Sequence, residues 1–335
     1  MEFRVLLAAT GDRRSRRGGP DRGIRYHLRA RTGSLAGRPG SRTMVVLQLL
    51  VAAIVALATA PAAFAGERVV ISAGLDGGSY YSIAQRLKTE LILRNALLPE
   101  LQTSQGSLQN LSRLADSSSV VNVALAQADA LHSYLSRHPD FRDQFFVLGD
   151  MGKECVFIVT SREGGLGSAA DLKRDRPGRL SVGSPGSGAA VTFEAMVSLD
   201  PAFSATERVY VPVMEALLQL KQGREFTKIE GAMLVQRPRW VSPPLRAVLD
   251  GVDDYRFLPL KSSDLPNASL PDGTPVYAFE RVTVGGKKAT RRQEVETFCT
   301  RALLLGSRTK LDHKTRDALS RVMMEKRQEI AGSDE

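Results

Sequence analysis

Residues 69–81 read Val-Val-Ile-Ser-Ala-Gly-Leu-Asp-Gly-Gly-Ser-Tyr-Tyr, and this stretch decides the expected fold. Its β-branched start predicts a strand, and its glycine-rich centre predicts a turn in which the backbone takes a positive φ. Beyond the turn, Ile83, Leu87 and Leu91 recur every four residues, which predicts a helix over about 79–94. A strand, a turn and a helix in this order form the repeating unit of an α/β fold.

A second unit of the same kind occurs later in the chain. A strand predicted at 179–182 leads into residues 183–188, Gly-Ser-Pro-Gly-Ser-Gly, and then into a helix over about 189–197. Elsewhere we expect strands at 101–104, 122–126, 145–148, 155–160, 209–211, 229–235 and 255–260, an extended segment at 276–284, and helices at 107–115, 128–136, 169–173, 214–222, 291–305 and 313–330. We therefore predict an α/β protein of two lobes joined by a hinge, each lobe a mainly parallel sheet flanked by helices. We place lobe I at 66–152 plus 253–335 and lobe II at 153–252, with the chain crossing between them near 149–152.

The positive charge of the chain is concentrated near its beginning. The sequence has 46 Lys and Arg against 36 Asp and Glu, a formal net charge of +10. Residues 1–43 contain eleven Arg and three acidic residues, residues 44–65 contain no charged residue, and residues 66–335 carry a net charge of only +2. A nearly neutral body has no electrostatic reason to bind a phosphate backbone, so we expect no nucleic-acid partner.

The uncharged segment 44–65 predicts a secretion signal. It holds an apolar stretch over 45–60 and ends in Ala-Pro-Ala-Ala-Phe-Ala, with small residues at Ala63 and Ala65 as signal peptidase requires. A membrane anchor is the alternative, because the run is long enough to span a bilayer. We expect a cleaved signal peptide at 44–65, after an Arg-rich leader at 1–43 that is disordered or precedes the true start, and a mature protein outside the cytoplasm.

The two helix starts that follow the glycine-rich turns are the candidate binding sites. Unpaired backbone N–H groups and the positive end of the helix dipole favour a carboxylate or a phosphate there. Ser79 and Ser187 are placed to act as helix caps or as hydroxyl donors to a ligand. Either turn alone is consistent with an ordinary strand-to-helix connection, whereas two such turns in two similar lobes would face one ligand across a cleft.

Motifs for cofactors, metals and catalysis are missing. No lysine of a phosphate-binding loop follows residues 183–188, and residues 74–78 lack the spacing of a dinucleotide-binding motif. The four His are scattered without metal-ligand spacing, and no nucleophile motif accompanies them. We therefore expect no cofactor, no metal ion and no enzymatic activity. Cys155, in a predicted strand, and Cys299, in the predicted helix 291–305, are either two buried free thiols or one long-range disulfide.

Several motifs taken together resemble the TAXI family of solute receptors for TRAP transporters. That family's Gly-Gly-x-x-Gly-Gly-Thr-Tyr-Tyr is matched here by Gly74, Gly77, Gly78, Ser79, Tyr80 and Tyr81, and its Gly-Ser-Val-Glu-Asn-Leu by Gly106, Ser107, Asn110 and Leu111. Gln127 and Asp129 match its Gln-x-Asp, residues 170–173 its Ala-Asp-Leu-Lys, and residues 183–189 its Gly-Pro-Pro-Gly-Ser-Gly-Thr. The order and intervals hold from about residue 69 to 191. The chain departs from the family at Ala189, where a hydroxyl is expected, and at 116–122 and 231–234.

The resemblance implies a two-lobed, hinge-closing periplasmic binding protein of the type II-like kind. Such a protein, expected here as a monomer, captures a small carboxylate or amino acid and presents it to a TRAP-type membrane permease. We expect the two tyrosines to pack on the aliphatic part of the ligand, the serines and nearby N–H groups to hold its carboxylates, and Gln127 to fix a polar end. The expected ligand-binding residues are Gly78, Ser79, Tyr80, Tyr81, Gln105, Ser107, Gln127, Asp129, Pro185, Gly186, Ser187 and Gly188. A ligand-sensing subunit for a membrane receptor or kinase is the alternative function.

Overall fold

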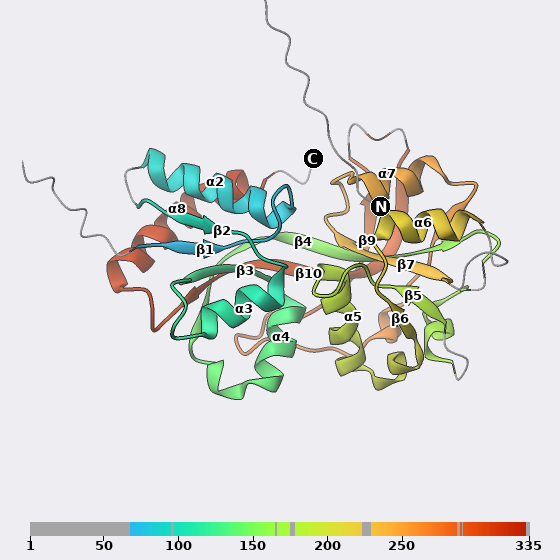
Figure 1. Ribbon diagram of the computed structural model, residues 1–335, viewed down its shortest axis with the longest axis horizontal. Coiled ribbons are helices and arrows are strands. Elements are labelled where there is room, and N and C mark those ends of the chain that lie inside the picture. The colour runs from blue at the N-terminus through green and yellow to red at the C-terminus, as the bar shows by residue number, and fades with distance from the viewer. Residues whose placement is uncertain are drawn as a thin grey trace, which may run out of the picture. The chain divides into compact units, whose positions relative to one another are not determined.

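The computed structural model describes residues 68–94, 97–164, 166–174, 178–222, 229–286, 289 and 291–332 (Figure 1). The chain divides into two compact units, Met1–Phe64 and Ala65–Glu335, and every described residue belongs to the second. The Arg-rich leader predicted at 1–43 and the signal peptide predicted at 44–65 therefore lie outside the described residues. Within the described ranges, no helix has the length and apolarity needed to cross a membrane.

The strands of the second unit form one mixed sheet. They are β1 Val70–Ser72, β2 Glu100–Gln102, β3 Val123–Gln127, β4 Phe145–Ser161, β5 Arg179–Ser181, β6 Glu207–Val209, β7 Gly231–Gln236, β8 Tyr255–Phe257, β9 Ala278–Val284 and β10 Gln293–Ser307. They pair in the order β2-β1-β3-β10-β4-β7-β5-β6, with β8 beside β4 and β9 beside β10. We call β2, β1 and β3 the first half of the sheet, and β7, β5 and β6 the second half.

The expectation of parallel strands is right at the two ends of the sheet and wrong at its centre. Strand β1 is parallel to β2 and β3, and β5 is parallel to β6 and β7. In contrast, β10 runs antiparallel to β3, β4 and β9, and β4 runs antiparallel to β7 and β8. The two strand-turn-helix units recognised in the sequence therefore flank an antiparallel centre.

Helices cover both faces of the sheet. They are α2 Ser79–Leu93, α3 Ser107–Ala115, α4 Ala128–Arg137, α5 Gly188–Leu199, α6 Val213–Gln222, α7 Pro243–Asp250 and α8 His313–Ala331. Figure 1 shows α2 and α8 on one side of the first half and α3 and α4 on the other, with α6 and α7 opposite α5 in the second half. Six of these helices match sequence predictions closely, whereas α7 was not predicted, and residues 169–173 form a 3-10 helix.

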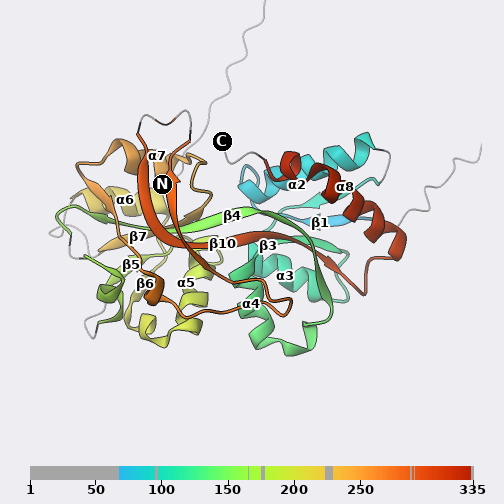
Figure 2. The same cartoon turned by 180° about the vertical axis from the view of Figure 1, so that it is seen from behind.

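The long strands β4 and β10 correct two predictions made from the sequence. The helix predicted at 291–305 is wrong, because this segment is β10; the strands predicted at 145–148 and 155–160 are one continuous strand, β4. From Thr297 onward, β10 is buried almost without interruption, so its apolar residues show no alternation that would separate a strand from a buried helix. Both strands run side by side in the centre of the sheet, between β3 of the first half and β7 of the second half (Figure 2).

The two cysteines form a disulfide between these strands. Cys155 faces Cys299 across the antiparallel pair, with a Cα–Cα distance of 3.9 Å, and the bond closes a loop of 144 residues. Of the two alternatives that the sequence left open, the long-range disulfide is therefore the one present. The helix wrongly predicted at 291–305 gave no sign of this disulfide. The two cysteines come together because β4 and β10 are adjacent strands that place Cys155 opposite Cys299.

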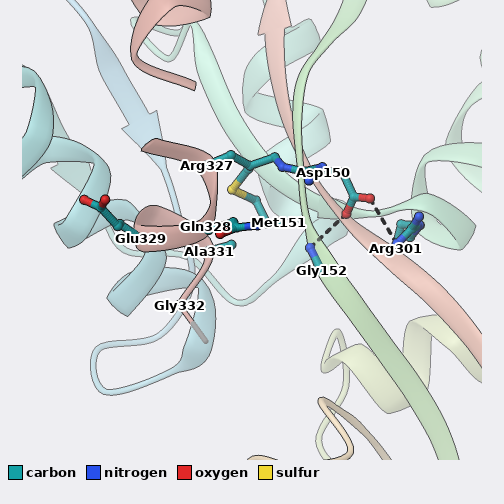
Figure 3. A pocket seen from close by; sticks show the side chains of 9 residues that line it. All are labelled: Asp150, Met151, Gly152, Arg301, Arg327, Gln328, Glu329, Ala331 and Gly332. Carbon is teal, nitrogen blue, oxygen red and sulfur yellow. Dashed lines mark hydrogen bonds and ion pairs between the residues drawn. The ribbon is translucent and has the colours of Figure 1, made fainter. Parts of the chain in front are cut away.

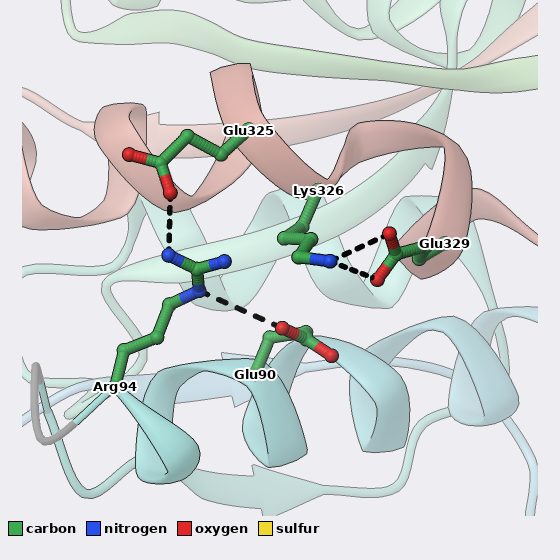
Figure 4. A network of polar contacts seen from close by, with 5 residues as sticks. All are labelled: Glu90, Arg94, Glu325, Lys326 and Glu329. Atoms are coloured by element: carbon green, nitrogen blue, oxygen red, sulfur yellow. Dashed lines mark hydrogen bonds and ion pairs between the residues drawn. The ribbon is translucent and has the colours of Figure 1, made fainter.

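The core follows the alternation of the strands. Ile71 and Leu304 pack beneath α2 and α8, while their neighbours Val70 and Leu305 pack against α3 and α4 on the opposite face. Where α2 meets α8, Arg94 pairs with Glu325, and other charged side chains lie around this contact (Figure 4). Ion pairs at such exposed positions contribute about 0–1 kcal/mol, so the apolar contacts hold these helices in place.

Strand β9 and the beginning of β10 pack with the second half of the sheet. Val282 and Val295 join the buried cluster that contains Phe157, Leu217 and Leu249 beneath α6 and α7. On the opposite face, the cluster beneath α5 includes residues from β4, β5 and β10. The lobe boundaries predicted at 152/153 and 252/253 remain a prediction.

Candidate functional site

The site predicted from the sequence depends on how α2 and α5 begin. Gly78 is the N-cap of α2, and no side chain caps this helix. The first N–H groups of a helix have no partner within it, so those of α2 are left for another acceptor. At α5 the cap is Ser187, whose Oγ accepts a hydrogen bond from the N–H of Ala190 at 3.3 Å and donates to the carbonyl of Val182 at 3.1 Å. Ser187 therefore uses its hydroxyl within its own turn.

The turn before α3 meets the turn before α5. A Cβ atom added at Gly106 would lie 3.0 Å from the carbonyl oxygen of Gly186, and Gly106 has a φ of 132°. Only glycine fits both this backbone conformation and this close approach. Nearby, a Cβ added at Gly188 would lie 3.3 Å from Oε1 of Gln127. These contacts join the first half of the sheet to the second at the start of α5.

A buried carboxylate connects α4 to α5. Oδ2 of Asp129 accepts hydrogen bonds from Oγ1 of Thr192 at 2.7 Å and from the hydroxyl of Tyr277 at 2.8 Å, while Oδ1 accepts from the N–H of Ala130 at 2.7 Å. Asp129 is completely buried. Burial raises the pKa of its carboxyl, and the bonds from Thr192, Tyr277 and Ala130 act in the opposite direction. Asp129 thus holds together segments that are far apart in the sequence.

A second buried carboxylate lies on β4, beside the disulfide. Oε2 of Glu154 accepts a hydrogen bond from the hydroxyl of Tyr80 at 3.2 Å. Burial raises the pKa of Glu154 to about 7, while the hydrogen bond from Tyr80 and the positive charge of Arg237 lower it, and the negative charge of Asp129 raises it. The pKa of the Tyr80 hydroxyl is raised well above its usual value by burial and by these two carboxyls. Glu154 is therefore a group whose charge changes near neutral pH.

Gln127 has a buried oxygen without a partner. Its Nε2 lies 3.4 Å from Oγ1 of Thr192, and Thr192 donates its single hydroxyl proton to Asp129. Thr192 therefore has no proton left to donate to Gln127. The amide nitrogen of Gln127, and not its amide oxygen, must then face Thr192, and this fixes the orientation of the amide group. Among the described residues, Oε1 of Gln127 has no hydrogen-bond partner. Buried polar atoms are nearly always hydrogen-bonded, so this acceptor indicates a place for a donor from a bound molecule or water.

The structure brings only some of the predicted site residues together. Tyr80, Ser107, Gln127 and Asp129 are buried, and Oγ of Ser107 accepts from the N–H of Gln127 at 3.1 Å. In contrast, the Gln105 side chain is exposed, and its backbone N–H donates to the side chain of Gln109 at 2.8 Å. The remaining predicted residues lie in or next to the turns before α2 and α5: Gly78, Ser79, Tyr81, Gly186, Ser187 and Gly188 are half-buried, and Pro185 is exposed.

Sequence reasoning missed three members of the buried polar cluster, namely Glu154, Thr192 and Tyr277. Glu154 directly precedes the apolar run 155–159, and Thr192 stands within the apolar start of α5. A polar residue within an otherwise apolar segment indicates a buried polar contact, because a polar side chain that is buried with such a segment requires a hydrogen-bond partner. Tyr277 carried no such signal, since it lies in an irregular segment just before β9.

Three cavities lie outside this cluster. One of about 620 Å³ is bounded by residues 150–152 of β4, Arg301 of β10 and residues 327–332 at the end of α8 (Figure 3). A second, of about 520 Å³, lies between α4, the start of β4 and residues 270–272, and a third, of about 370 Å³, lies along α2. None of the three is lined by a predicted site residue. Within the described residues, no group of three or more His, Cys, Asp and Glu is arranged to hold a metal ion.

A mixed sheet with helices on both faces, whose two halves meet at a buried polar cluster, defines the chain as an α/β protein with a polar junction between its halves. The sequence pattern of the NMT1-like family matches residues 71–331, so the chain belongs to this family. No curated protein matches it in sequence.

The solved structures that this chain resembles differ widely from it in sequence. XAC2383 from Xanthomonas citri, bound to ATP, is 11% identical with a TM-score of 0.48, over 78% of this chain and 83% of that one. YhfZ from Shigella flexneri is 14% identical with a TM-score of 0.45, over 79% and 90%. The periplasmic aliphatic sulphonate binding protein SsuA from Escherichia coli is 12% identical with a TM-score of 0.43, over 79% and 77%. Similarity this distant does not identify a ligand.

Proposed function

We propose that this chain is an extracytoplasmic solute-binding protein. It captures a small carboxylate or amino acid where the two halves of its sheet meet, and it presents that solute to a TRAP-type membrane permease. The two lobes predicted from the sequence would open and close about β4 and β10, the paired strands that lie between the two halves of the sheet. The proposal includes a periplasmic, monomeric protein and no catalytic step.

The observation that carries the proposal is the meeting of the predicted motifs. The turn before α3, the end of β3 and the turn before α5 are separated in sequence, yet Gly106 touches Gly186 and Gln127 touches Gly188. At this meeting point the amide oxygen of Gln127 is buried and lacks a partner. An unpaired acceptor among converging glycine-rich turns is the arrangement expected of a small-molecule site.

The start of α2 is the proposed anchor for the carboxylate of the solute. Its N–H groups are uncapped by any side chain, and Tyr80 and Tyr81 stand in its first turn. The two buried carboxyls of Asp129 and Glu154 would repel a ligand that carries a second negative charge besides its anchored carboxylate. Among small carboxylates and amino acids they therefore favour a ligand that also carries an ammonium group. The ammonium group would also supply a donor for the oxygen of Gln127.

Support for the permease partner and the periplasmic location comes from the sequence. The motifs that resemble TAXI receptors lie between about 69 and 191, and several of them form the junction described above. The predicted signal peptide at 44–65 is consistent with export. The chain's departures from the family motif, such as Ala189, bear on which solute is bound.

A thermal-shift screen tests the binding function. The purified full-length chain is unfolded with amino acids and with mono- and dicarboxylates, starting with L-glutamate. A solute at about 100 times its dissociation constant adds about 2.7 kcal/mol to the free energy of unfolding, which raises the melting temperature by roughly 5–10 °C. A folded protein that no member of the panel stabilises would contradict the proposal.

Substitutions at Ser79 test how the solute is held. Ser79→Pro removes the N–H of the first helical residue, and the extended backbone of Gly78, with φ −77° and ψ 164°, accepts a following proline. We expect Ser79→Pro to weaken binding of the stabilising solute about tenfold with little change in folding. Ser79→Ala is the matched control, because it keeps the N–H and removes only the hydroxyl. Equal affinity of both variants and the wild type, measured by calorimetry, would place the carboxylate elsewhere.

A further inference from the structure

Glu154 is buried on β4 with one of its two carboxyl oxygens unpaired. The residue is 5% exposed, and its Oε2 accepts a hydrogen bond from the hydroxyl of Tyr80 at 3.2 Å. Among the described residues, its Oε1 has no hydrogen-bond partner and Glu154 forms no ion pair. The preceding residue on the strand, Lys153, is paired with Glu280 instead. Glu154 therefore lacks the paired cation that a buried carboxylate usually has.

Groups from four other segments face Glu154. Tyr80 comes from α2, Asp129 from α4, and Arg237 follows β7, while Thr300 stands opposite Glu154 on β10. The Oγ1 of Thr300 accepts a hydrogen bond from the N–H of Asp129 at 3.3 Å, so the start of α4 lies beside this strand pair. Arg237 acts on Glu154 through its charge, and Tyr80 keeps its proton at neutral pH because burial raises its pKa. The groups here that can change charge near neutral pH are therefore carboxyls.

A second unpaired acceptor belongs to the same junction, namely Oε1 of Gln127. Gln127 is 1% exposed, and this oxygen has no hydrogen-bond partner among the described residues. Its amide nitrogen lies 3.4 Å from Oγ1 of Thr192, which in turn donates to Asp129 at 2.7 Å. The negative charge of Asp129 also raises the pKa of Glu154. The unpaired oxygens of Gln127 and Glu154 are thus both close to Asp129.

An ammonium group fits this pattern better than a metal ion does. It carries one positive charge and three N–H donors, which suits two unpaired acceptors beside buried carboxyls. A calcium ion takes about six to eight oxygen ligands. Within the described residues, no group of three or more His, Cys, Asp and Glu is arranged to hold a metal ion.

We propose that Glu154 is the counter-ion of the solute's ammonium group and loses its proton when the solute binds. The inference rests on the proposed function and assigns the solute to compounds that carry both a carboxylate and an ammonium group. In the free protein at pH 6, the proton of Glu154 is on Oε1, because Oε2 accepts the hydroxyl of Tyr80. On binding, this O–H bond breaks, the proton passes to the buffer, and the carboxylate accepts an N–H of the ammonium group, which keeps its own three protons.

The sign of the pH dependence follows from this exchange. Burial raises the pKa of Glu154 to about 7, so the free protein carries the proton at pH 6 and has largely lost it at pH 8. Affinity for an amino acid should therefore rise as the pH rises through about 7, because the proton no longer has to be removed. A solute with only negative charge would bind more weakly over the same range.

A thermal-shift comparison of matched pairs tests the charge of the solute on the full-length chain. Each amino acid is paired with the acid that lacks only its α-ammonium group, as L-glutamate with glutarate and L-leucine with 4-methylpentanoate. We expect an amino acid to stabilise the protein and its paired acid to stabilise it much less. Equal stabilisation by both members overturns the inference and leaves the binding function standing. A folded protein that no member stabilises contradicts the binding function itself, and the inference with it.

Titration calorimetry with the stabilising amino acid tests the role of Glu154. For the wild type we expect about tenfold higher affinity at pH 8 than at pH 6 and, from buffers of different ionisation enthalpy, release of close to one proton at pH 6. Glu154→Gln should bind more weakly at pH 8 and lose the pH dependence, while Glu163→Gln, at an exposed position, should follow the wild type. Equal affinity of the wild type at both pH values, or a pH dependence that persists in Glu154→Gln, overturns the proposal.

Two further arms use the neighbours of Glu154. Tyr80→Phe removes the hydrogen bond that lowers the pKa of Glu154, so the midpoint of the affinity curve should move to higher pH. An unchanged midpoint would mean that another group releases the proton, which overturns the proposal. Calcium chloride at about 5 mM should not raise the melting temperature. Stabilisation by calcium in the wild type but not in Glu154→Gln would assign the acceptors to an inorganic cation instead.

Discussion

In the turn before α2, Gly77 has a φ of 76° and Gly78 begins the helix without a side-chain cap; in the turn before α5, Gly186 has a φ of 77° and Ser187 caps the helix through its hydroxyl. Both turns therefore use a glycine in the left-handed region to bring the chain from a parallel strand into a helix. They differ in where their polar groups go. The start of α2 keeps its N–H groups available, whereas the start of α5 satisfies one of them internally.

This difference assigns separate roles to two turns that look equivalent in sequence. The start of α2 suits a ligand carboxylate, because nothing in its own turn competes for its N–H groups. The start of α5 is instead held in place, by Ser187 at its cap and by the bond from Thr192 to Asp129 one turn later. Similar glycine patterns thus give one open helix start and one anchored helix start.

The largest effect is expected from removing the anchor of α5. Asp129→Ala leaves the hydroxyls of Thr192 and Tyr277 and the N–H of Ala130 buried without their acceptor. We expect the free energy of unfolding to fall by about 3 kcal/mol in urea titrations at pH 7. Asp317→Ala, at an exposed position on α8, is the control and should change it by less than about 0.5 kcal/mol. Equal values for the two variants would mean that Asp129 does not anchor α5.

The stability contributed by the contact between α2 and β4, in which Tyr80 donates a hydrogen bond to Glu154, should depend on pH. The pKa of Glu154 is raised to about 7 in the folded protein, so its neutral form stabilises the fold. This stabilisation is complete below the pKa of Glu154 in the unfolded chain, near 4.5. It is lost as the pH rises through the pKa in the folded protein, about 7. Asp129, whose pKa is also raised, acts in the same direction.

Glu154→Gln isolates this pH dependence. Between pH 5 and pH 8 we expect the wild type to lose roughly 2 kcal/mol more of its free energy of unfolding than this variant does. Tyr80, Arg237 and Asp129 face Glu154 and remain in place. Glu163→Gln, at an exposed position, should follow the wild-type curve. Parallel curves for the wild type and Glu154→Gln would show that Glu154 does not titrate in this range.

The smallest effect is a direct test of the two helix starts. Ser187→Ala removes a side-chain cap and should lower the free energy of unfolding by about 1 kcal/mol, while Ser79→Ala should lower it by only a few tenths. Urea titrations of both variants under identical conditions measure the difference. If Ser79→Ala were the more costly substitution, the assignment of open and anchored starts would have to be reversed.

How much of the fold the sequence predicted depends on the kind of segment. The helices at 79–93, 107–115, 128–137, 188–199, 213–222 and 313–331 were predictable, because a helix exposed on one side shows its period of 3.6 in the sequence. Strand β10 was mistaken for a helix, because a segment buried on both faces shows no period at all. The disulfide could not be inferred until β10 was recognised as the neighbour of β4.

The site was predictable where the backbone itself required particular residues. Glycines in the turns and polar residues next to them marked the starts of α2, α3 and α5, and the turns before α3 and α5 do approach each other. Gln105 and Pro185 share the same stretches of sequence and yet are exposed. Glu154, Thr192 and Tyr277 escaped notice, because their importance comes from partners that lie far away in the chain.

The sequence by itself determined the α/β character of the chain, the positions of its glycine-rich turns and the concentration of its net positive charge in residues 1–43. These properties are local, since they depend on side-chain period, backbone freedom and composition. Only the tertiary structure decided that β4 and β10 form an antiparallel centre, that Cys155 and Cys299 are bonded, and that Asp129 and Glu154 are buried. The pairing of distant strands and the burial of a charge depend on what surrounds a residue in space, which a single sequence does not record.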